Sequence, residues 1–437
     1  MIISVSYFIL IISFSLGQVL PQSSFAKHGE PCISDMSCQK GLFCKMDRCY
    51  TKYETSHLEV LGLLEQNTCN IDKPCPNNQK CIYNRCVDRN VKEKENNKKA
   101  EIKSSVDLIF AGDIKLNKIS YLSGFKSNLK INYNHLFSNI SKIVEKADFS
   151  LVAHNTPFNI NFEKKNPEEM YRNIPKEFGE AISNGGFKAA LYASPNTYNL
   201  KEKGVIDTIR FWEKSSVRAL GISSTLEESK NDYLIIEKNK IKIGIINFSD
   251  YSVNIPKEKS FMINIISTPK IKEIVEKLKK NKVDLIIACV NWGKKNSKIP
   301  NQVQINWAKS LAYYGVNLII GNYPSFVQPV SYVKAKNGKQ ALVFFSLGSL
   351  IGGYFQEKIS FSALANIRIN KLSDNTIEIG DYCLIPIVNR SSKKKYSVYL
   401  LSDYLEKLEA EKKEFYVVKN IIKNCNNAMP DFSNCSK

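Results

Sequence analysis

Three apolar runs in the second half of the chain each stop abruptly in a polar turn that contains glycine. The runs and their turns are 284–290 with 291–293, 318–320 with 321–325, and 341–345 with 346–349. Unbroken apolar runs are typical of strands that are buried on both faces, as in parallel sheets. Because such sheets place ligand sites outside the carboxyl ends of their strands, the three turns predict one shared site. We therefore expect an α/β fold.

Three further strands of the same design precede these runs. The strands and their turns are 106–111 with 112–113, 149–152 with 153–157, and 188–192 with 193–199. The polar side chains that we expect to line a cleft at the common edge are Asp113, Asn155, Asn196, Asn199, Asn291, Asn322, Ser325 and Ser349. Their amides and hydroxyls suit polyhydroxylated or peptide-like ligands. They would equally fill an inactive site with internal hydrogen bonds, and the pattern does not single out a catalytic residue.

Taken together, these turns resemble the CapA family of bacterial capsule-synthesis proteins, which is associated with poly-γ-glutamate. The core of that family is similar to a calcineurin-type metallophosphatase. The resemblance covers about residues 106–388 and rests on six separate motifs in the same order. It implies a metallophosphatase-like sandwich of two sheets flanked by helices, in the order α/β/β/α.

The chain departs from the family pattern at the positions that would bind metal. The family shows His-Trp-Gly, Gly-His-His-Pro-His and Ser-Leu-Gly-Asn at the last three strand ends. Here the corresponding segments 291–293, 321–325 and 346–349 read Asn-Trp-Gly, Gly-Asn-Tyr-Pro-Ser and Ser-Leu-Gly-Ser. Every histidine of the pattern has therefore been replaced.

Two of the first three strand ends depart in the same way. Asn155 stands where the family has Glu, Asn196 stands where it has His, and Asn199 stands where it has Asp. Asp113 is retained, and a carboxylate at this first strand end is a metal ligand in metallophosphatase-like folds. His154 occupies a position that is normally Leu, so we predict a packed histidine rather than a ligand.

A two-metal site needs several carboxylates and imidazoles to neutralise the ions and acidify a bridging water. The four histidines of the chain are His28, His57, His135 and His154, and none falls on a family ligand position. Asn can join a Ca²⁺ or Mg²⁺ shell, but Asp113 alone supplies too little charge to hold one. We therefore predict no cofactor, no divalent metal and a catalytically degenerate protein. The chain also lacks a Gly-x-Ser-x-Gly elbow, a phosphate-binding loop and a dinucleotide fingerprint.

The amino-terminal quarter predicts export. Residues 1–26 contain an apolar segment of signal-peptide length, with cleavage after Gly17 or Ala26, and an uncleaved anchor is the alternative. No later stretch approaches the roughly 20 apolar residues that span a bilayer. We expect a secreted or cell-envelope protein that meets a membrane only through this segment if it is uncleaved.

A duplicated cysteine unit occupies residues 27–88. Its two copies, 32–49 and 69–86, share the same gaps of five, five and four residues between cysteines. The cysteines are Cys32, Cys38, Cys44, Cys49, Cys69, Cys75, Cys81 and Cys86. Behind a signal sequence, units this small predict two disulfides each, with the connectivity open. Zinc is the competing interpretation, although zinc sites usually offer closer cysteine pairs.

The remaining segments complete the domain plan. Residues 89–105 are charged and poor in apolar side chains, which predicts a linker before the large domain at 106–388. In the tail 389–437, residues 402–423 predict a charged amphipathic helix, and Cys425 and Cys435 could pair in an oxidising compartment. Cys289 and Cys383 lie in apolar strands, so we predict buried free thiols.

The formal charge of +20 favours attraction to polyanions, although a compositional drift toward Lys and Asn would also produce it. We predict a secreted CapA-like protein that serves the synthesis, export or retention of an anionic capsule polymer such as poly-γ-glutamate by binding. Its partner would be that polymer or a cell-surface component, and not a specific nucleic acid. One alternative is a metal-dependent phosphoesterase or other hydrolase with a non-standard site around Asp113. Another is an adhesion or matrix protein that acts through its cysteine repeats.

Overall fold

The computed structural model describes residues 42–45, 48–51, 79–82, 85–88, 100–125, 130–159, 174–352, 359–392 and 395–410. The chain divides into two units, Met1–Val91 and Lys92–Lys437. The predicted signal peptide at 1–26 and the predicted pair Cys425 and Cys435 lie outside the described residues. Among the described helices, none is long and apolar enough to cross a membrane.

The described parts of the first unit are two β-hairpins, one in each cysteine repeat. Strand β1 (Leu42–Lys45) pairs antiparallel with β2 (Arg48–Thr51), and β3 (Gln79–Ile82) pairs in the same way with β4 (Arg85–Asp88). The last two cysteines of each repeat lie opposite one another in these ladders, Cys44 opposite Cys49 and Cys81 opposite Cys86. The duplicated spacing therefore corresponds to a duplicated hairpin, while the disulfide pairing stays a prediction.

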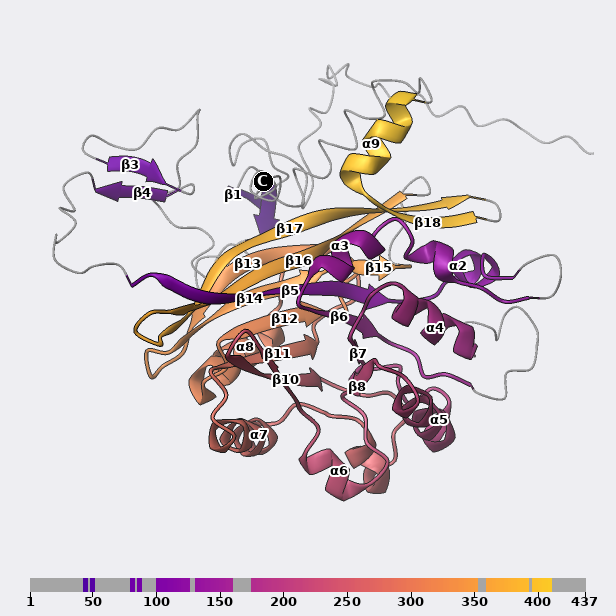
Figure 1. Ribbon diagram of the computed structural model, residues 1–437, viewed down its shortest axis with the longest axis horizontal. Coiled ribbons are helices and arrows are strands. Elements are labelled where there is room, and N and C mark those ends of the chain that lie inside the picture. The colour runs from indigo at the N-terminus through magenta and orange to yellow at the C-terminus, as the bar shows by residue number, and fades with distance from the viewer. Residues whose placement is uncertain are drawn as a thin grey trace, which may run out of the picture. The chain divides into compact units, whose positions relative to one another are not determined.

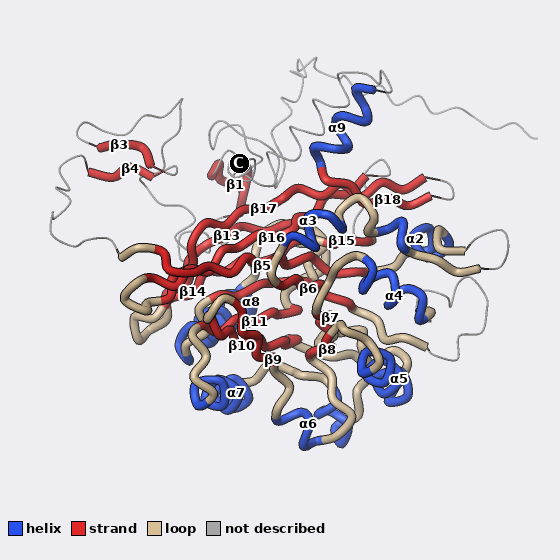
Figure 2. Tube along the Cα trace, viewed as in Figure 1, coloured by secondary structure: helices blue, strands red, loops and turns tan. Residues whose placement is uncertain are grey.

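In the second unit, the described residues form two mixed sheets (Figure 1, Figure 2). The larger sheet has the strand order β18-β17-β16-β5-β6-β7-β8, with β15 beside β5. Its strands are β5 (Ile102–Ile114), β6 (Phe149–His154), β7 (Ala189–Leu191), β8 (Arg218–Leu220), β15 (Ser349–Ile351), β16 (Ile359–Leu372), β17 (Ile377–Ser392) and β18 (Lys395–Leu400). Strands β5 to β8 run parallel, and β16 to β18 extend the sheet in antiparallel pairs.

The smaller sheet has the order β13-β14-β12-β11-β10-β9. Its strands are β9 (Leu234–Lys238), β10 (Ile241–Ser249), β11 (Leu285–Asn291), β12 (Leu318–Asn322), β13 (Val327–Lys334) and β14 (Gln340–Leu347). The four central strands are parallel, and antiparallel strands close both edges. The β9–β10 hairpin turns at Asn239 and Lys240, whose φ angles of 52° and 62° suit a type I′ turn.

Most of the helices lie on the outer faces of the two sheets, and the last one packs against β17 and β18 (Figure 2). They are α2 (Lys118–Leu122), α3 (Ser141–Lys146), α4 (Lys176–Asn184), α5 (Lys201–Glu213), α6 (Leu226–Lys230), α7 (Thr268–Lys280), α8 (Gln302–Tyr314) and α9 (Leu401–Ala410), with 3₁₀ turns η2 (Asn134–Leu136) and η4 (Lys257–Met262). Helix α8 begins at an Asn301 cap and ends at Gly315, whose φ of 108° is the left-handed conformation that glycine adopts freely. Helices α7 and α8 flank the smaller sheet, and α4 and α5 cover the larger one.

One apolar core lies between the sheets and a second lies between the larger sheet and its helices. Every residue of β11 and of β12 is buried, which explains why their apolar runs are continuous rather than alternating. This layering confirms the predicted α/β/β/α sandwich of two sheets.

Three boundary or cysteine predictions need correction. The predicted linker ends too late, because residues 102–105 already belong to β5 and pair with β16. The predicted domain end at 388 is too early, because β17 continues to Ser392 and pairs with β18. Polar residues alternate there with apolar ones, so in the sequence this exposed strand resembles a tail.

Cys289 is a buried free thiol, as predicted. Cys383 is disulfide-bonded and only partly buried, so the prediction of a buried free thiol at Cys383 is wrong. The described part of the predicted helix at 402–423 is α9.

Candidate functional site

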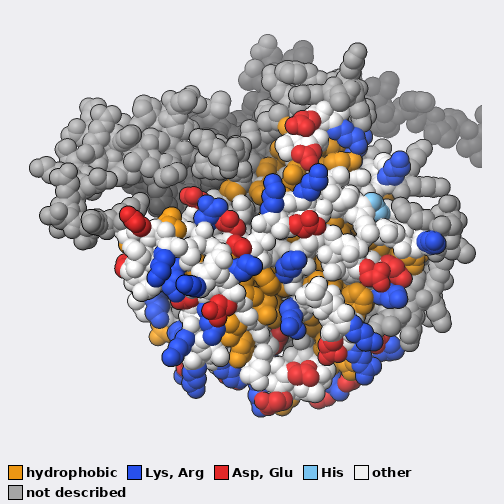
Figure 3. All heavy atoms as spheres, viewed as in Figure 1, with side chains coloured by type: hydrophobic (Ala, Val, Ile, Leu, Met, Phe, Trp, Pro, Cys, Tyr) orange, Lys and Arg blue, Asp and Glu red, His pale blue; other side chains and the backbone are white. Residues whose placement is uncertain are grey.

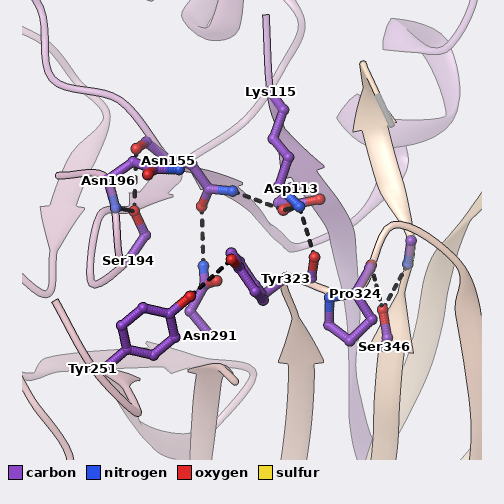
Figure 4. A network of polar contacts seen from close by, with 11 residues as sticks. Asp113, Lys115, Asn155, Ser194, Asn196, Tyr251, Asn291, Tyr323, Pro324 and Ser346 are labelled. Carbon is purple, nitrogen blue, oxygen red and sulfur yellow. Dashed lines mark hydrogen bonds and ion pairs between the residues drawn. The ribbon is translucent and has the colours of Figure 1, made fainter. Parts of the chain in front are cut away.

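The carboxyl ends of strands from both sheets bring three of the predicted polar residues into one hydrogen-bonded row (Figure 4). Asn291, at the end of β11, donates from Nδ2 to Oδ1 of Asn155 at 3.0 Å. Asn155, directly after β6, donates from Nδ2 to Oδ2 of Asp113 at 2.7 Å. All three side chains are buried, with at most 2% of each residue exposed. The row therefore joins the two sheets at their shared edge.

Close backbone contact allows this junction to form. A Cβ atom on Gly112 would lie only 2.2 Å from the carbonyl oxygen of Gly348, so no larger residue fits there. The register of β5 against β6 shifts between Ala111 and Asp113, and the Asp113 N–H donates to the Gly348 oxygen at 3.2 Å. The bulge turns the Asp113 carboxylate toward the row of asparagines.

Lys115 is the partner of Asp113 that sequence reasoning missed. Its Nζ lies 2.7 Å from Oδ2 of Asp113, and the Lys115 side chain is 17% exposed, whereas the Asp113 side chain is 0% exposed. The same ammonium donates to the carbonyl oxygen of Tyr323 at 2.6 Å and lies 4.7 Å from the centroid of the Tyr323 ring. The sequence spacing of Asp113 and Lys115 did indicate this pair, because residues two apart on an extended strand point to the same face.

Tyr323 covers this ion pair in an unusual backbone conformation. Its φ of 93° is rare for a bulky side chain and is held here by its contacts with Lys115 and Tyr251. The Tyr251 hydroxyl donates to the Tyr323 hydroxyl at 2.8 Å, and the rings meet edge to face. Burial raises the pKa of Tyr251, and the hydrogen bond to Tyr323 raises it further, so this hydroxyl stays neutral.

Asp250 is a second carboxylate near the edge that the sequence patterns did not indicate. It follows β10 directly, and its Oδ2 accepts the N–H of Gly293 at 2.9 Å. Its own N–H donates to the carbonyl oxygen of Asn291 at 2.9 Å. Burial raises the pKa of Asp250 to about 6, although the hydrogen bond from Gly293 opposes the shift.

The other predicted residues do not join this row through described side-chain hydrogen bonds. The backbone N–H of Asn196 donates to Oγ of Ser194, which donates to the carbonyl oxygen of Asn155 at 3.1 Å. Asn199 is partly exposed at the turn before α5. Ser325 is buried in the turn after β12, and no described side-chain hydrogen bond joins it to the row. Ser349 lies beside Asp113 in the pairing of β15 with β5. The expected cleft is thus a largely buried polar network.

Several buried oxygen atoms of this network have no hydrogen-bond partner among the described residues. They are Asp113 Oδ1, Asn291 Oδ1, Asn322 Oδ1 and Ser349 Oγ, together with Oδ1 of Asp250, whose backbone N–H donates to Asn291. Since buried polar atoms without partners are costly, these positions suit ordered water or the donor groups of a ligand.

The residues present do not fit the two-metal centre that the fold family implies. Asp113 is engaged by an ammonium on one oxygen, and Asn155 turns its NH₂ group, not its oxygen, toward that carboxylate. Within the described residues, no group of three or more His, Cys, Asp or Glu side chains lies together as a metal site would need.

His154 is packed in the core, as predicted. Its ring lies 5.1 to 5.5 Å from the rings of Phe158, Phe178 and Tyr192, and the residue is fully buried. Burial lowers the pKa of His154 to about 3, which keeps the imidazole neutral.

These features define a class: a two-sheet α/β sandwich whose strand-end site holds asparagines where the resemblance implies metal ligands, and a lysine paired with the retained aspartate. The family model for the bacterial capsule synthesis protein PGA_cap matches residues 107–354, more than half of the chain, so the chain belongs to this family. The family predicted from the motifs is thereby confirmed, and family membership indicates a capsule-related role.

Two curated relatives carry names of the same kind. The chain is 24% identical over 270 residues to the capsule biosynthesis protein CapA of Bacillus anthracis, covering 60% of this chain and 63% of the relative. It is 21% identical over 284 residues to the PGA biosynthesis protein CapA of Bacillus subtilis (strain 168), covering 62% and 69%. The match thus spans a little under two thirds of the first relative.

Among solved structures, the NAD nucleotidase of Haemophilus influenzae aligns with a TM-score of 0.41 at 11% identity, covering 74% of this chain and 60% of that one. A putative 5'-nucleotidase from Staphylococcus aureus aligns with a TM-score of 0.40 at 13% identity, covering 65% and 54%.

Proposed function

We propose that this protein is secreted and serves the synthesis, export or retention of an anionic capsule polymer, such as poly-γ-glutamate, by binding rather than by catalysis. Membership of the capsule synthesis family supports the general role, and the printed name of the Bacillus subtilis relative refers to PGA. The apolar leader and the duplicated cysteine repeats support export.

The observation that carries the proposal is the ion pair between Lys115 and Asp113. A hydrolytic metal centre needs free carboxylates and imidazoles to acidify water. Here the carboxylate that the family pattern retains is neutralised by an ammonium of the same chain. The neighbouring side chains are amides, which neither take up nor release protons near neutral pH. The row can therefore hold a shape and offer hydrogen bonds, and it lacks the groups of a metal phosphoesterase.

The charge of the chain supports an anionic partner. The formal net charge is +20, which attracts polyanions at low ionic strength. On the described part of the face seen in Figure 3, Lys and Arg side chains (blue) lie among Asp and Glu side chains (red). The excess charge alone therefore does not point to one binding surface on that face.

A hydrolase with a non-standard site remains the second candidate because of Asp250. A buried carboxyl group whose pKa is raised to about 6 can exchange a proton near neutral pH, as a general acid or base must. Its Oδ1 has no described partner and is buried at the same edge.

The test uses the purified full-length protein. We would measure binding of poly-γ-glutamate by calorimetry, polymer length by gel filtration after long incubation, and metal content after equilibration with Mn²⁺, Zn²⁺ and Mg²⁺. We expect binding, unchanged polymer length and less than stoichiometric metal. One or two equivalents of metal that Asp113→Asn removes, or polymer shortening that Asp250→Asn abolishes, would establish the hydrolase instead. Absence of binding to the polymer would refute the proposal.

A further inference from the structure

The loop at residues 293–300 carries a concentration of positive charge beside the candidate site. It follows the last residue of β11, Asn291, which belongs to the hydrogen-bonded row. Lys294, Lys295 and Lys298 are exposed on it, and the segment from Gly293 to the start of α8 contains no acidic residue. The basic groups therefore stand at the carboxyl edge of the sheets, where this fold class places its ligands.

The backbone of this loop is anchored by buried amides. Gln328, on β13, donates from Nε2 to the carbonyl oxygens of Ile299 at 2.8 Å and Ser297 at 3.2 Å. Its Oε1 accepts from Nε2 of Gln304, on α8, at 2.7 Å, and both glutamines are almost fully buried. Since a buried amide is stable only when it is hydrogen-bonded, this pair ties the loop to strand β13 and to helix α8.

The two ends of the loop are fixed as well. The N–H of Gly293 donates to Asp250 at 2.9 Å, and Asn301 caps the first turn of α8. The Nζ of Lys298 lies 5.5 Å from the centroid of the Phe326 ring, one residue beyond the turn at 321–325. The loop thus presents its lysines from a backbone that the fold holds in place, which limits the entropy lost when a ligand binds.

Two lysines of α7, the helix beside the smaller sheet, have interaction partners among the described residues, unlike Lys294 and Lys295. On α7, Lys277 pairs with Glu273 at 2.9 Å, and Lys279 donates to the carbonyl oxygen of Tyr314 at 2.8 Å. Within the described residues, no acidic side chain pairs with Lys294 or Lys295. Their ammonium groups are therefore available to an external anion, whereas Lys115 is engaged by Asp113.

We propose that the loop at 293–300 is the surface that contacts the anionic polymer, through Lys294, Lys295 and Lys298. This inference rests on the proposed function. The chemistry favours a polycarboxylate over a nucleic acid, because the loop offers ammonium point charges but no arginine fork and no aromatic ring for base stacking. Such contacts are individually weak and are screened by salt, so a polymer with many carboxylates suits them better than a single small anion.

The experiment compares two triple variants that remove the same charge at opposite ends of the same strands. The loop variant is Lys294→Gln, Lys295→Gln and Lys298→Gln, after the carboxyl end of β11. The control is Lys240→Gln, Lys280→Gln and Lys282→Gln, three exposed lysines that precede the amino ends of β10 and β11. Thermal unfolding of both variants verifies that the fold is intact. The probe is poly-γ-glutamate, titrated by calorimetry at several salt concentrations.

We expect the loop variant to bind on the order of ten-fold more weakly at low salt, with a shallower salt dependence, since each exposed ion pair contributes little but three act together. The control should bind within about two-fold of the natural protein. Equal weakening of both variants would show that net charge rather than the loop attracts the polymer, which overturns this inference and leaves the proposed function standing. If the natural protein does not bind the polymer, both fail. Tighter binding to a single-stranded polynucleotide of equal charge would replace the polycarboxylate with a nucleic acid.

Discussion

The space between the two sheets and the edge where their strands end are both largely buried, yet the first holds apolar side chains and the second holds polar and charged ones. Between the sheets the buried side chains are aliphatic and aromatic, such as Phe110, Ile287 and Phe344. At the edge the buried groups are a carboxylate, an ammonium and a row of amides, some of whose oxygens have no described partner. Burial of apolar area stabilises the fold, whereas buried polar groups cost free energy unless they are paired. The core therefore holds in place an edge that would not assemble on its own.

The largest effect should come from the apolar side of this comparison. Phe344 is fully buried on β14, so we expect Phe344→Ala to lower the free energy of unfolding by about 4 kcal/mol. Val303→Ala, at a half-exposed position of α8, is the matched control and should cost less than about 1 kcal/mol. Chemical denaturation measures both. Similar losses for the two variants would mean that the space between the sheets does not carry the stability.

The second effect tests the polar side. Lys115→Met leaves the Asp113 carboxylate buried without its counter-charge, and we expect a loss of about 3 kcal/mol. Adding Asp113→Asn to the same chain removes the uncompensated charge and should restore most of that stability. A double variant no more stable than Lys115→Met would show that the ammonium acts through packing on Tyr323 rather than through the ion pair.

The third effect depends on pH and concerns the one histidine that lies beside the edge. The folded pKa of His154 is about 3, below its ordinary 6.5, so the folded state favours the neutral ring. This contribution is fully present above pH 6.5 and is lost as pH falls toward 3. From pH 7 to pH 5 the natural protein should lose about 2 kcal/mol through this group. His154→Leu should show a smaller loss over the same range, and an equal loss in both proteins would contradict the buried neutral ring.

The smallest effect has the opposite sign and belongs to Asp250. Its folded pKa of about 6 is raised above the ordinary 3.8, so the folded state favours the protonated form. That stability is fully present below pH 3.8 and is lost as pH rises through about 6. Asp250→Asn can keep the hydrogen bond from Gly293 and should gain about 1 kcal/mol relative to the natural protein between pH 4 and pH 5. Denaturation curves at both pH values measure the difference. If the difference in the free energy of unfolding between the two proteins is the same at both pH values, the Asp250 carboxyl group has an ordinary pKa and is in contact with water.

Sequence reasoning succeeded where local pattern and tertiary environment agree. The unbroken apolar runs of β11 and β12 predicted strands buried on both faces. It failed for β18 and the end of β17, because an edge strand with one exposed face carries a polar alternation that a tail also shows.

The amino-acid sequence by itself determined the layer order of this protein, its family and the polar residues at the strand ends. The strand ends follow from the apolar runs and their turns, and the layer order follows from the family resemblance that the motifs carry; both are properties of neighbouring residues. Only the tertiary structure decided that Asp113 is neutralised by Lys115, that Tyr323 covers the pair, and that Gln328 anchors the loop carrying Lys294. The contacts of Tyr323 and Gln328 join residues that are distant in sequence, and the geometry of all three contacts depends on sheet register and on the close approach of backbones such as that at Gly112. A one-dimensional pattern contains neither.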